Sequence, residues 1–429
     1  VMFDQCKALI IGLQKRGAVV GSSLNTAYLL ERLSQTLERL ETLMAIFVSN
    51  RYLPRRILLL TGCFARAAAE RHSISRLWKQ SSGLIARSVT QNAGDHGEHY
   101  ITRDKKEYWA MFYSAAGGGV LIALMALFKT YLGSIIDDKV WKGLAEGLNY
   151  GFGFMVIFML HFTVATKQPA MTAARFAEAV EKNPQGKTLN MKLAQLLVDV
   201  FRSQSVAVLG NVVVAMGLAA LIAFVYQHQT GEPLMNSEKI AYQLHRIDPL
   251  DGSLWFAAIA GVWLFCSGII SGYFDNRSNY LNMRMRLAQH PLLKKLMSEK
   301  SRVKFANYMH ENYGSLIGNF CFGMLLGLTG LVGYLTHLPL DIRHVAFSSA
   351  NLGYSAVSGQ FAYPFFLQCI AFVLLIGLVN LMVSFSLTLW VALRSLNTEI
   401  DSWWAIWHEV CQIVKKRPLS LFFPVQLDK

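Results

Sequence analysis

Several side chains suited to binding a ligand lie where long apolar stretches of the chain end. The densest group lies at the end of the second apolar stretch and combines hydrogen-bonding side chains with a cation and a proline. Its members are His161, Thr163, Thr166, Lys167, Gln168 and Pro169. Proline ends or kinks a helix and leaves carbonyl groups available to a ligand. We interpret this group either as a ligand-binding or gating site, or as a polar helix end whose lysine reaches the membrane surface.

A second group of polar residues lies in the connection 337–363, which is otherwise about half apolar. Its candidate ligand-binding residues are Asp341, Arg343, His344, Ser348 and Asn351. A connection of this composition either dips back among the helices, forms a lid outside them, or lies as an amphipathic segment at the interface. The sequence leaves these three interpretations open.

Single polar residues also interrupt the apolar stretches. Asn211 and Asn319 lie early in the third and fifth stretches, and Asp275 and Asn276 end the fourth. A polar side chain within a membrane costs free energy unless it has a partner. Each asparagine therefore either bonds a neighbouring helix or contacts a ligand, and we expect Asp275 to pair with Lys167.

The sequence predicts neither a metal site nor a catalytic centre. The segment 92–100 holds residues of metal-ligand type, but we interpret Glu98, His99 and Tyr100 as a polar elbow at the membrane surface. The six cysteines are isolated, which indicates neither a disulfide framework nor a zinc site. Nucleotide-binding, nucleophile-elbow and zinc-protease motifs are absent, so we expect no cofactor and no catalytic residue.

Six apolar stretches set the architecture that must position these groups. Each approaches the roughly 20 residues with which a helix crosses a bilayer. They lie at 109–128, 147–166, 205–226, 253–273, 315–335 and 365–391. The sequence therefore predicts an all-α membrane protein with six transmembrane helices.

The formal net charge of +14 is unevenly distributed. Most lysines and arginines lie in the N-terminal region, the second and fourth connections and the C-terminal tail. Cationic loops stay on the cytoplasmic side of a membrane, so this pattern predicts cytosolic N- and C-termini in a multi-pass protein. Membrane lipids are the expected partners of the cationic loops, and a nucleic-acid partner is not expected.

A helical region precedes the first apolar stretch. In residues 22–48, leucines and other apolar side chains recur in alternating steps of three and four, the spacing of a heptad seam. A second helical block is expected from about residue 55 to 90. We predict a cytosolic helical domain at 1–108, a transmembrane domain at 109–393 and a cytosolic tail at 394–429. Because the helical pattern is already under way at Val1, we expect the natural chain to begin upstream.

Glycines recur every four residues in the predicted transmembrane helices, a spacing that lets two helices approach closely. The rows are Gly143/Gly147/Gly151, Gly268/Gly272, Gly314/Gly318 and Gly323/Gly327. They indicate either tight packing of one bundle or a glycine-lined conduit.

Four blocks of this sequence resemble a bacterial membrane family described as site-specific recombinase, of the Gcr type. The blocks are 97–100, 162–174, 271–273 and 339–353. The resemblance implies a bacterial inner-membrane protein, and the family description implies DNA strand exchange. A tyrosine recombinase needs a His-x-x-Arg group, whereas His72 precedes Arg76 at a different spacing. A serine recombinase needs a serine amid arginines, which Ser34 imitates only loosely.

Polar groups at both ends of a glycine-packed bundle, without a catalytic set, favour transport or lipid handling. The first alternative is a membrane scaffold that recruits a protein partner, or a second copy of the chain, through its heptad helix. The second alternative is DNA recombination, as the family description says.

Overall fold

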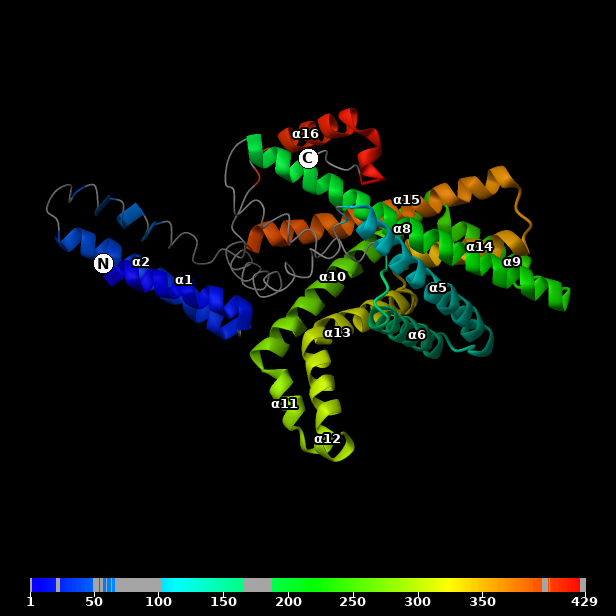
Figure 1. The fold of residues 1–429 in the computed structure, drawn as a ribbon. Helices are drawn as coiled ribbons and strands as arrows, with labels where there is room; N and C mark the ends of the chain where they lie inside the picture. The colour runs from blue at the N-terminus through cyan, green and yellow to red at the C-terminus, as the bar shows by residue number, and fades with distance from the viewer. Residues whose placement is uncertain are drawn as a thin grey trace. The chain divides into compact units, whose positions relative to one another are not determined.

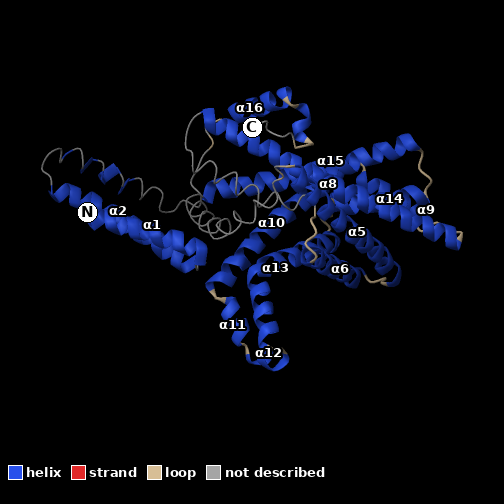
Figure 2. Ribbon diagram, in the orientation of Figure 1, coloured by secondary structure: helices blue, strands red, loops and turns tan. Residues whose placement is uncertain are grey.

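Helices make up most of the part of the chain that the computed structural model describes (Figures 1 and 2). The structure describes residues 2–20, 24–48, isolated positions between 54 and 65, 102, 104–164, 187–395, 400 and 402–424. These residues contain no strand, and the predicted all-α fold class is confirmed.

The chain divides into two compact units. The first combines Val1–Asn92, Gly272–Asn312 and Arg394–Asn397. The second combines Ala93–Ser271, Tyr313–Leu393 and Thr398–Lys429. Three long helices contribute to both units: α10 (Ser253–Tyr280), α13 (Glu299–Thr336) and α15 (Tyr363–Ser395), of which only the last two residues belong to the first unit.

The first unit contains the N-terminal helices α1 (Met2–Val20) and α2 (Leu24–Val48), joined by a 2.5 Å ion pair between Lys7 and Glu41. The predicted amphipathic helix is α2, but its heptad seam remains largely exposed, as the 82% exposure of Phe47 illustrates. Most of the second predicted block lies outside the described residues. The unit also holds α11 (Met283–Gln289) and α12 (Pro291–Leu296).

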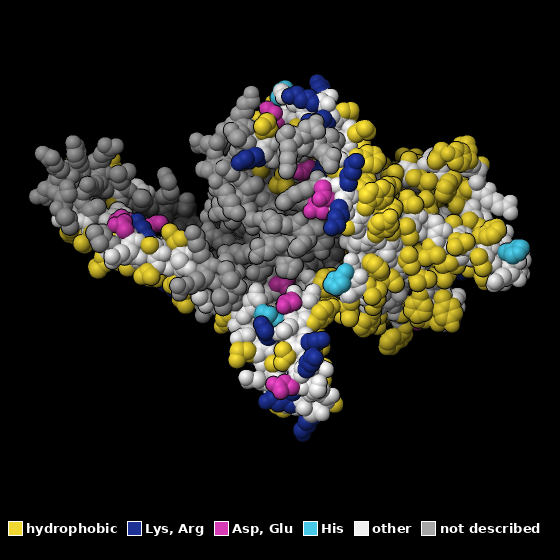
Figure 3. Space-filling view, in the orientation of Figure 1, with side chains coloured by type: hydrophobic (Ala, Val, Ile, Leu, Met, Phe, Trp, Pro, Cys, Tyr) yellow, Lys and Arg dark blue, Asp and Glu magenta, His cyan; other side chains and the backbone are white. Residues whose placement is uncertain are grey.

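The second unit holds the apolar helices. In chain order its other elements are α5 (Lys105–Ile135), α6 (Lys139–Met159), α8 (Lys187–Thr230), α9 (Ser237–Ile247), η2 (Pro249–Asp251), α14 (Val345–Ser358), α15 (Tyr363–Ser395), α16 (Trp403–Lys416) and η3 (Pro418–Leu421). Hydrophobic side chains cover most of the visible surface of this unit around α5, α8, α14 and α15 (Figure 3). A largely apolar surface of this kind suits contact with lipid.

Five described helices are long and apolar enough to cross a membrane, against the six predicted. They are α5, α8, α10, α13 and α15. The predicted second stretch, 147–166, corresponds to α6, which ends at Met159. This helix is not among the five, since it contains Lys142, Glu146 and Asn149, which lower its hydropathy.

Contacts between side chains show the directions of α5, α6 and α8. Lys129 pairs with Glu146, and the Ser114 carbonyl accepts from the backbone N–H of Thr163, so α6 and the residues after it run antiparallel to α5. Along α8, Gly210 lies against Phe112 and Ala215 lies against Gly119. Residue numbers rise together in these two contacts, which means that α5 and α8 run parallel.

Glycines bring α6 and α13 into backbone contact. A Cβ added to Gly323 would meet the backbone at Gly151, and one added to Gly327 would meet Gly147. Gly143 lies against Leu331 in the same antiparallel arrangement. The glycine rows at 143–151 and 323–327 therefore pack against each other, as expected for small residues every four positions.

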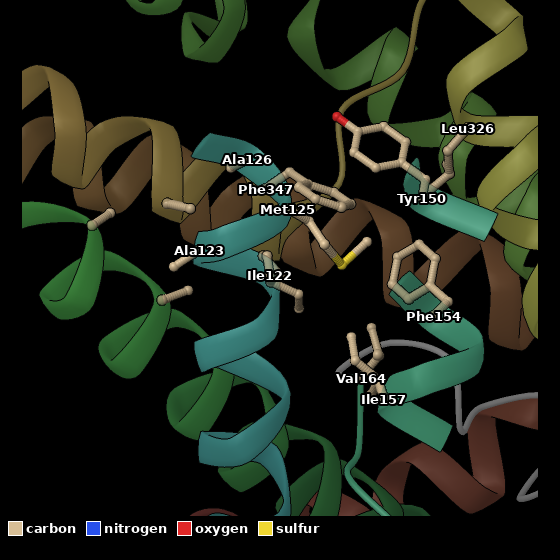
Figure 4. Close-up of a cluster of buried hydrophobic side chains, with 14 of the residues drawn as sticks. Ile122, Ala123, Met125, Ala126, Tyr150, Phe154, Ile157, Val164, Leu326 and Phe347 are labelled. Atoms are coloured by element: carbon tan, nitrogen blue, oxygen red, sulfur yellow. The ribbon is translucent and has the colours of Figure 1, made fainter. Parts of the chain in front are cut away.

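The centre of the second unit is a cluster of buried apolar side chains, most of them from α5, α6, α8, α10, α13 and α14 (Figure 4). Phe154 of α6 packs between Phe322 of α13 and Phe347 of α14, with ring centroids 4.9 and 5.9 Å apart. Met125 and Ile122 of α5 face this group in the close-up view. The short helix α14 is thus surrounded by the long helices.

We expect Gly323→Ala to destabilise the second unit, because the new methyl group has no space between α13 and α6. Overpacking of this kind costs about 1–3 kcal/mol. Gly217→Ala is the matched control, since a Cβ at Gly217 on α8 meets nothing within 4 Å. Alanine there should raise stability by up to about 1 kcal/mol through helix propensity. Thermal unfolding in detergent measures both changes, and equal effects of the two variants would contradict the packing described.

Candidate functional site

The connection between α13 and α15 enters the interior of the second unit. After α13 ends, residues 339–344 are non-helical and lead directly into α14. The backbone N–H of Arg343 donates to the carbonyl of Phe256 at 3.2 Å, so this extended segment is bonded to the first turn of α10. Of the three interpretations left open by the sequence, the structure matches a segment that dips back among the helices.

One asparagine holds the turn between the extended segment and α14. The Asn380 side chain accepts from the backbone N–H of Val345 at 3.1 Å and donates to the carbonyls of Arg343 and Ala257 at 2.9 and 2.8 Å. Asn380 is fully buried and lies about midway along α15. It therefore pairs two backbone groups where α14 begins, the Val345 N–H and the Arg343 carbonyl, which would otherwise be unpaired away from water, and it links them to α10 through Ala257.

Helix α14 is buried along most of its length. Its 14 residues span about 21 Å, which is too short for a membrane crossing. Gly353 lies against the backbone of α8, and the Tyr354 hydroxyl donates to the Ala123 carbonyl of α5 at 3.0 Å. We call residues 337–358 the re-entrant segment, because an extended part and a helical part enter and leave the same bundle.

Three charged residues join the re-entrant segment to α9. Asp341 lies between two guanidinium groups, at 2.6 Å from Arg343 and 3.5 Å from Arg246. Arg343 also donates to the backbone carbonyl of Arg246 at 2.7 Å, and Arg246 donates to the carbonyl of Ile342 at 3.2 Å. Charge and backbone bonding together fix the position of the extended part.

The electrostatics of Asp341 follow from this geometry. Burial raises the pKa of the carboxyl group, but the positive charges of Arg246 and Arg343 and the hydrogen bonds that it accepts outweigh burial. The net result is a pKa below its ordinary value, so Asp341 is ionised at neutral pH.

A second ion pair lies next to this group, between α5 and α6. Lys129 and Glu146 are 3.0 Å apart, and the Lys129 ammonium lies 5.5 Å from the centre of the Tyr150 ring. Arg246 is close enough to interact electrostatically with both Lys129 and Tyr150. Three cations and two carboxylates therefore form one network, which we call the charge network: Lys129, Glu146, Arg246, Asp341 and Arg343.

Helix α6 ends in a hydrogen-bonded C-cap deep beside α5. His161 adopts a left-handed conformation with φ of 58°. Its backbone N–H donates to the Phe158 carbonyl, and the backbone N–H of Phe162 donates to the Ile157 carbonyl. This pair of bonds is the Schellman arrangement, in which the left-handed position usually belongs to glycine. Helix α6 therefore stops before the end of the predicted stretch.

The residues that follow α6 are extended and pair with α5 and α8. Thr163 accepts from the Ser114 hydroxyl at 2.9 Å. The Asn211 side chain donates to the carbonyls of Thr163, at 3.0 Å, and Ala115. Asn211 thus has a role after α6 like that of Asn380 before α14, because it pairs the non-helical Thr163 carbonyl and links it to α5 through Ala115.

The structure brings some of the predicted site residues together. Asp341, Arg343, His344 and Ser348 meet at the start of α14, and Thr163 bonds Asn211. Asn351 lies farther along α14, and Asn319 bonds Ser315 one turn earlier in its own helix. Asp275 and Asn276 belong to the part of α10 in the first unit. The predictions for Thr166, Lys167, Gln168, Pro169, Glu98, His99 and Tyr100 lie outside the described residues, as does the pairing of Lys167 with Asp275.

Sequence reasoning missed Asn380, Arg246, Lys129 and Glu146. Asn380 carried a signal, because it is an uncharged polar residue within the last apolar stretch, where a partner is required. The other three lie near stretch ends, where charged residues are ordinary. Their pairing depends on contacts between distant parts of the chain.

We expect Asn380→Leu to destabilise the second unit, because it leaves the Val345 N–H and the Arg343 carbonyl without their partner and removes the bond to Ala257 of α10. Each such group costs about 1–3 kcal/mol. The control is Asn149→Leu, which removes a single hydrogen bond to the Met125 carbonyl. Thermal unfolding in detergent should show a clearly larger loss for Asn380→Leu, and a smaller loss than that of the control would contradict the role assigned to Asn380.

The charge network also predicts a pH dependence. Because the folded-state pKa of Asp341 lies below the ordinary value of 3.8, its contribution to stability is complete above that value. The contribution is lost as the pH falls through the lower folded-state pKa. Asp341→Asn should therefore lower the free energy of unfolding by about 1–3 kcal/mol at neutral pH. The difference from wild type, measured by unfolding across a pH series, should shrink only below about pH 4. A difference that vanishes already at neutral pH would contradict the ion pairing.

Comparison with known proteins gives a single finding on family membership. A family model described as site-specific recombinase matches residues 1–424, a range that includes the charge network and the re-entrant segment. No curated protein matches the chain, and no solved structure matches it. The resemblance seen in the sequence is confirmed by this match, and the chain belongs to the site-specific recombinase family.

Proposed function

We propose that the chain crosses a bacterial inner membrane six times and acts in transport or lipid handling. The sixth crossing would be α6 together with the extended residues after it. The parallel directions of α5 and α8 support this proposal, because a chain that passes twice in one direction must return in between. The alternation of cationic connections supports cytosolic termini.

The observation that carries the proposed function is a pair of helix breaks within an apolar bundle. One is the non-helical segment 160–164 that follows α6, and the other is the extended part of the re-entrant segment. Irregular backbone at membrane depth is tolerated only where protein buries it or where it lines a polar path. Transporters place their substrate sites at such discontinuous helices.

The charge network suits a gate or a headgroup site at one end of this bundle. Its three cations exceed its two carboxylates, and Lys129 and Arg246 belong to different helices, α5 and α9. An acidic substrate group can exchange with Asp341 or Glu146 as the partner of these cations. We therefore assign the network a role in admitting a substrate with a negative charge.

Reconstitution of the full chain into vesicles tests this proposal. Movement of fluorescent phospholipids between leaflets and efflux of trapped anions should both be compared with empty vesicles. Arg246→Gln should lower the protein-dependent rate at least about tenfold, as expected for loss of an interaction worth more than about 1.4 kcal/mol. Lys239→Gln is the matched control, because Lys239 is an exposed cation on the same helix, α9.

Two results would count against this function. Wild-type rates equal to those of empty vesicles for every lipid and anion would contradict transport and lipid handling. Equal losses of rate in Arg246→Gln and Lys239→Gln would show that the charge network has no specific role in the movement. The family description favours DNA recombination as a second candidate function. Specific cleavage or strand exchange by the purified full chain, with no flux, would establish that alternative.

A further inference from the structure

Helix α16 has three distinct faces. Its residues follow one another at about 100° around the helix axis. The first face carries Ile406 and Val410, which are buried against Leu193 and Val198 of α8. This contact fixes α16 along the beginning of α8 and leaves two other faces exposed.

The two exposed faces differ in chemistry. One carries Trp404 and Trp407, whose exposed fractions are 78% and 58%. The other carries exposed polar residues, among them His408 and Gln412, which bond each other at 2.9 Å. Tryptophan side chains of this exposure are costly in water and are enriched at membrane interfaces, where the ring meets both apolar and polar surroundings.

Cations gather where α16 ends. Lys415, Lys416 and Arg417 are consecutive and exposed. On an ideal helix, Lys415 lies next to the direction of Trp404, so its long side chain borders the tryptophan face. A helix with an aromatic face bordered by lysines is the pattern that binds the surface of acidic bilayers.

A buried arginine fixes the segment after α16. Arg202 of α8 donates to the Ser420 carbonyl at 3.2 Å, to the Thr102 carbonyl at 2.5 Å and to the Asp199 carboxylate at 2.8 Å. The segment η3 is therefore held both to α8 and to the chain that leads into α5.

The same segment lies beside the start of a predicted membrane crossing. The ring of Phe423 is 5.8 Å from that of Tyr108 in the first turn of α5. Trp109 and Tyr113 continue this aromatic group along α5 and are themselves exposed. Aromatic rings gather in this way where a helix passes from the hydrocarbon into the headgroup layer.

We propose that α16 lies in the headgroup layer of the membrane and binds acidic phospholipids. Trp404 and Trp407 enter the boundary with the acyl chains, and Lys415, Lys416 and Arg417 contact lipid phosphates. The polar face with His408 and Gln412 remains in water. This inference requires that α5 crosses a membrane, and it does not depend on transport.

Spin labels on two neighbouring residues of α16 test the orientation. Cys411 lies between the directions of Trp404 and Trp407, so a full-length variant that keeps only this cysteine carries a label on the tryptophan face. The control replaces Cys411 with serine and introduces Gln412→Cys on the polar face. In vesicles of phosphatidylcholine and phosphatidylglycerol, the label at 411 should collide more with oxygen than with a water-soluble nickel complex. The label at 412 should show the opposite preference.

The lipid preference needs a second comparison. Adding phosphatidylglycerol to phosphatidylcholine vesicles should raise the oxygen preference at 411, and Lys415→Gln with Lys416→Gln should abolish this rise. Lys294→Gln with Lys295→Gln, an adjacent pair in α12, is the matched control and should leave the rise intact. Each lysine near an acidic membrane surface raises the binding constant for that surface about fivefold.

Three outcomes would overturn the inference. Equal nickel accessibility at 411 and 412 would place the tryptophan face in water. Protection of 411 from both oxygen and nickel would mean that protein covers it. Protection of both labels by duplex DNA at low salt, with no effect of phosphatidylglycerol, would assign the cations to nucleic acid.

Discussion

The architecture of the second unit depends on the pairing of backbone groups where a helix is interrupted among apolar side chains. An unpaired N–H or C=O in such surroundings costs several kcal/mol, roughly the stability of a whole domain if a few are left unpaired. Asn211 and Asn380 prevent this at two places, each by bonding more than one segment of chain. Without these two asparagines, the extended residues after α6 and before α14 would bury backbone groups that have no hydrogen-bond partner.

The charge network acts on the second of these interruptions, the extended residues before α14. Asp341 and Arg343 belong to the re-entrant segment, Arg246 belongs to α9, and Lys129 with Glu146 joins α5 to α6. A largely buried ion pair adds little net stability, but removing one partner leaves a charge without compensation. Such a network therefore selects one arrangement of the segments and, in the proposed function, releases it when an acidic substrate group replaces one of its carboxylates. This property underlies the proposed role in admitting an acidic substrate.

The sequence predicted much of this fold because hydropathy and glycine spacing are local signals. Five of the six apolar stretches correspond to helices that are long and apolar enough to cross a membrane, and the glycine row from Gly143 to Gly151 packs as expected. The end of α6 at Met159 was not predicted, since its C-cap uses a left-handed histidine where glycine is the usual signal. The network formed by Arg246 was also not predicted, because its partners are close only after folding.

The most direct measurement is the side of the membrane from which the two ends of the re-entrant segment are reached. Leu338→Cys and Gln360→Cys, each in a full chain without other cysteines, can be labelled with an impermeant maleimide in sealed vesicles of known orientation. The structure places α14 inside the bundle as a helix too short to cross, so both positions should react from the same side, opposite to Gln412→Cys. Reaction of 338 and 360 from opposite sides would mean that the segment crosses the membrane, and would contradict the account.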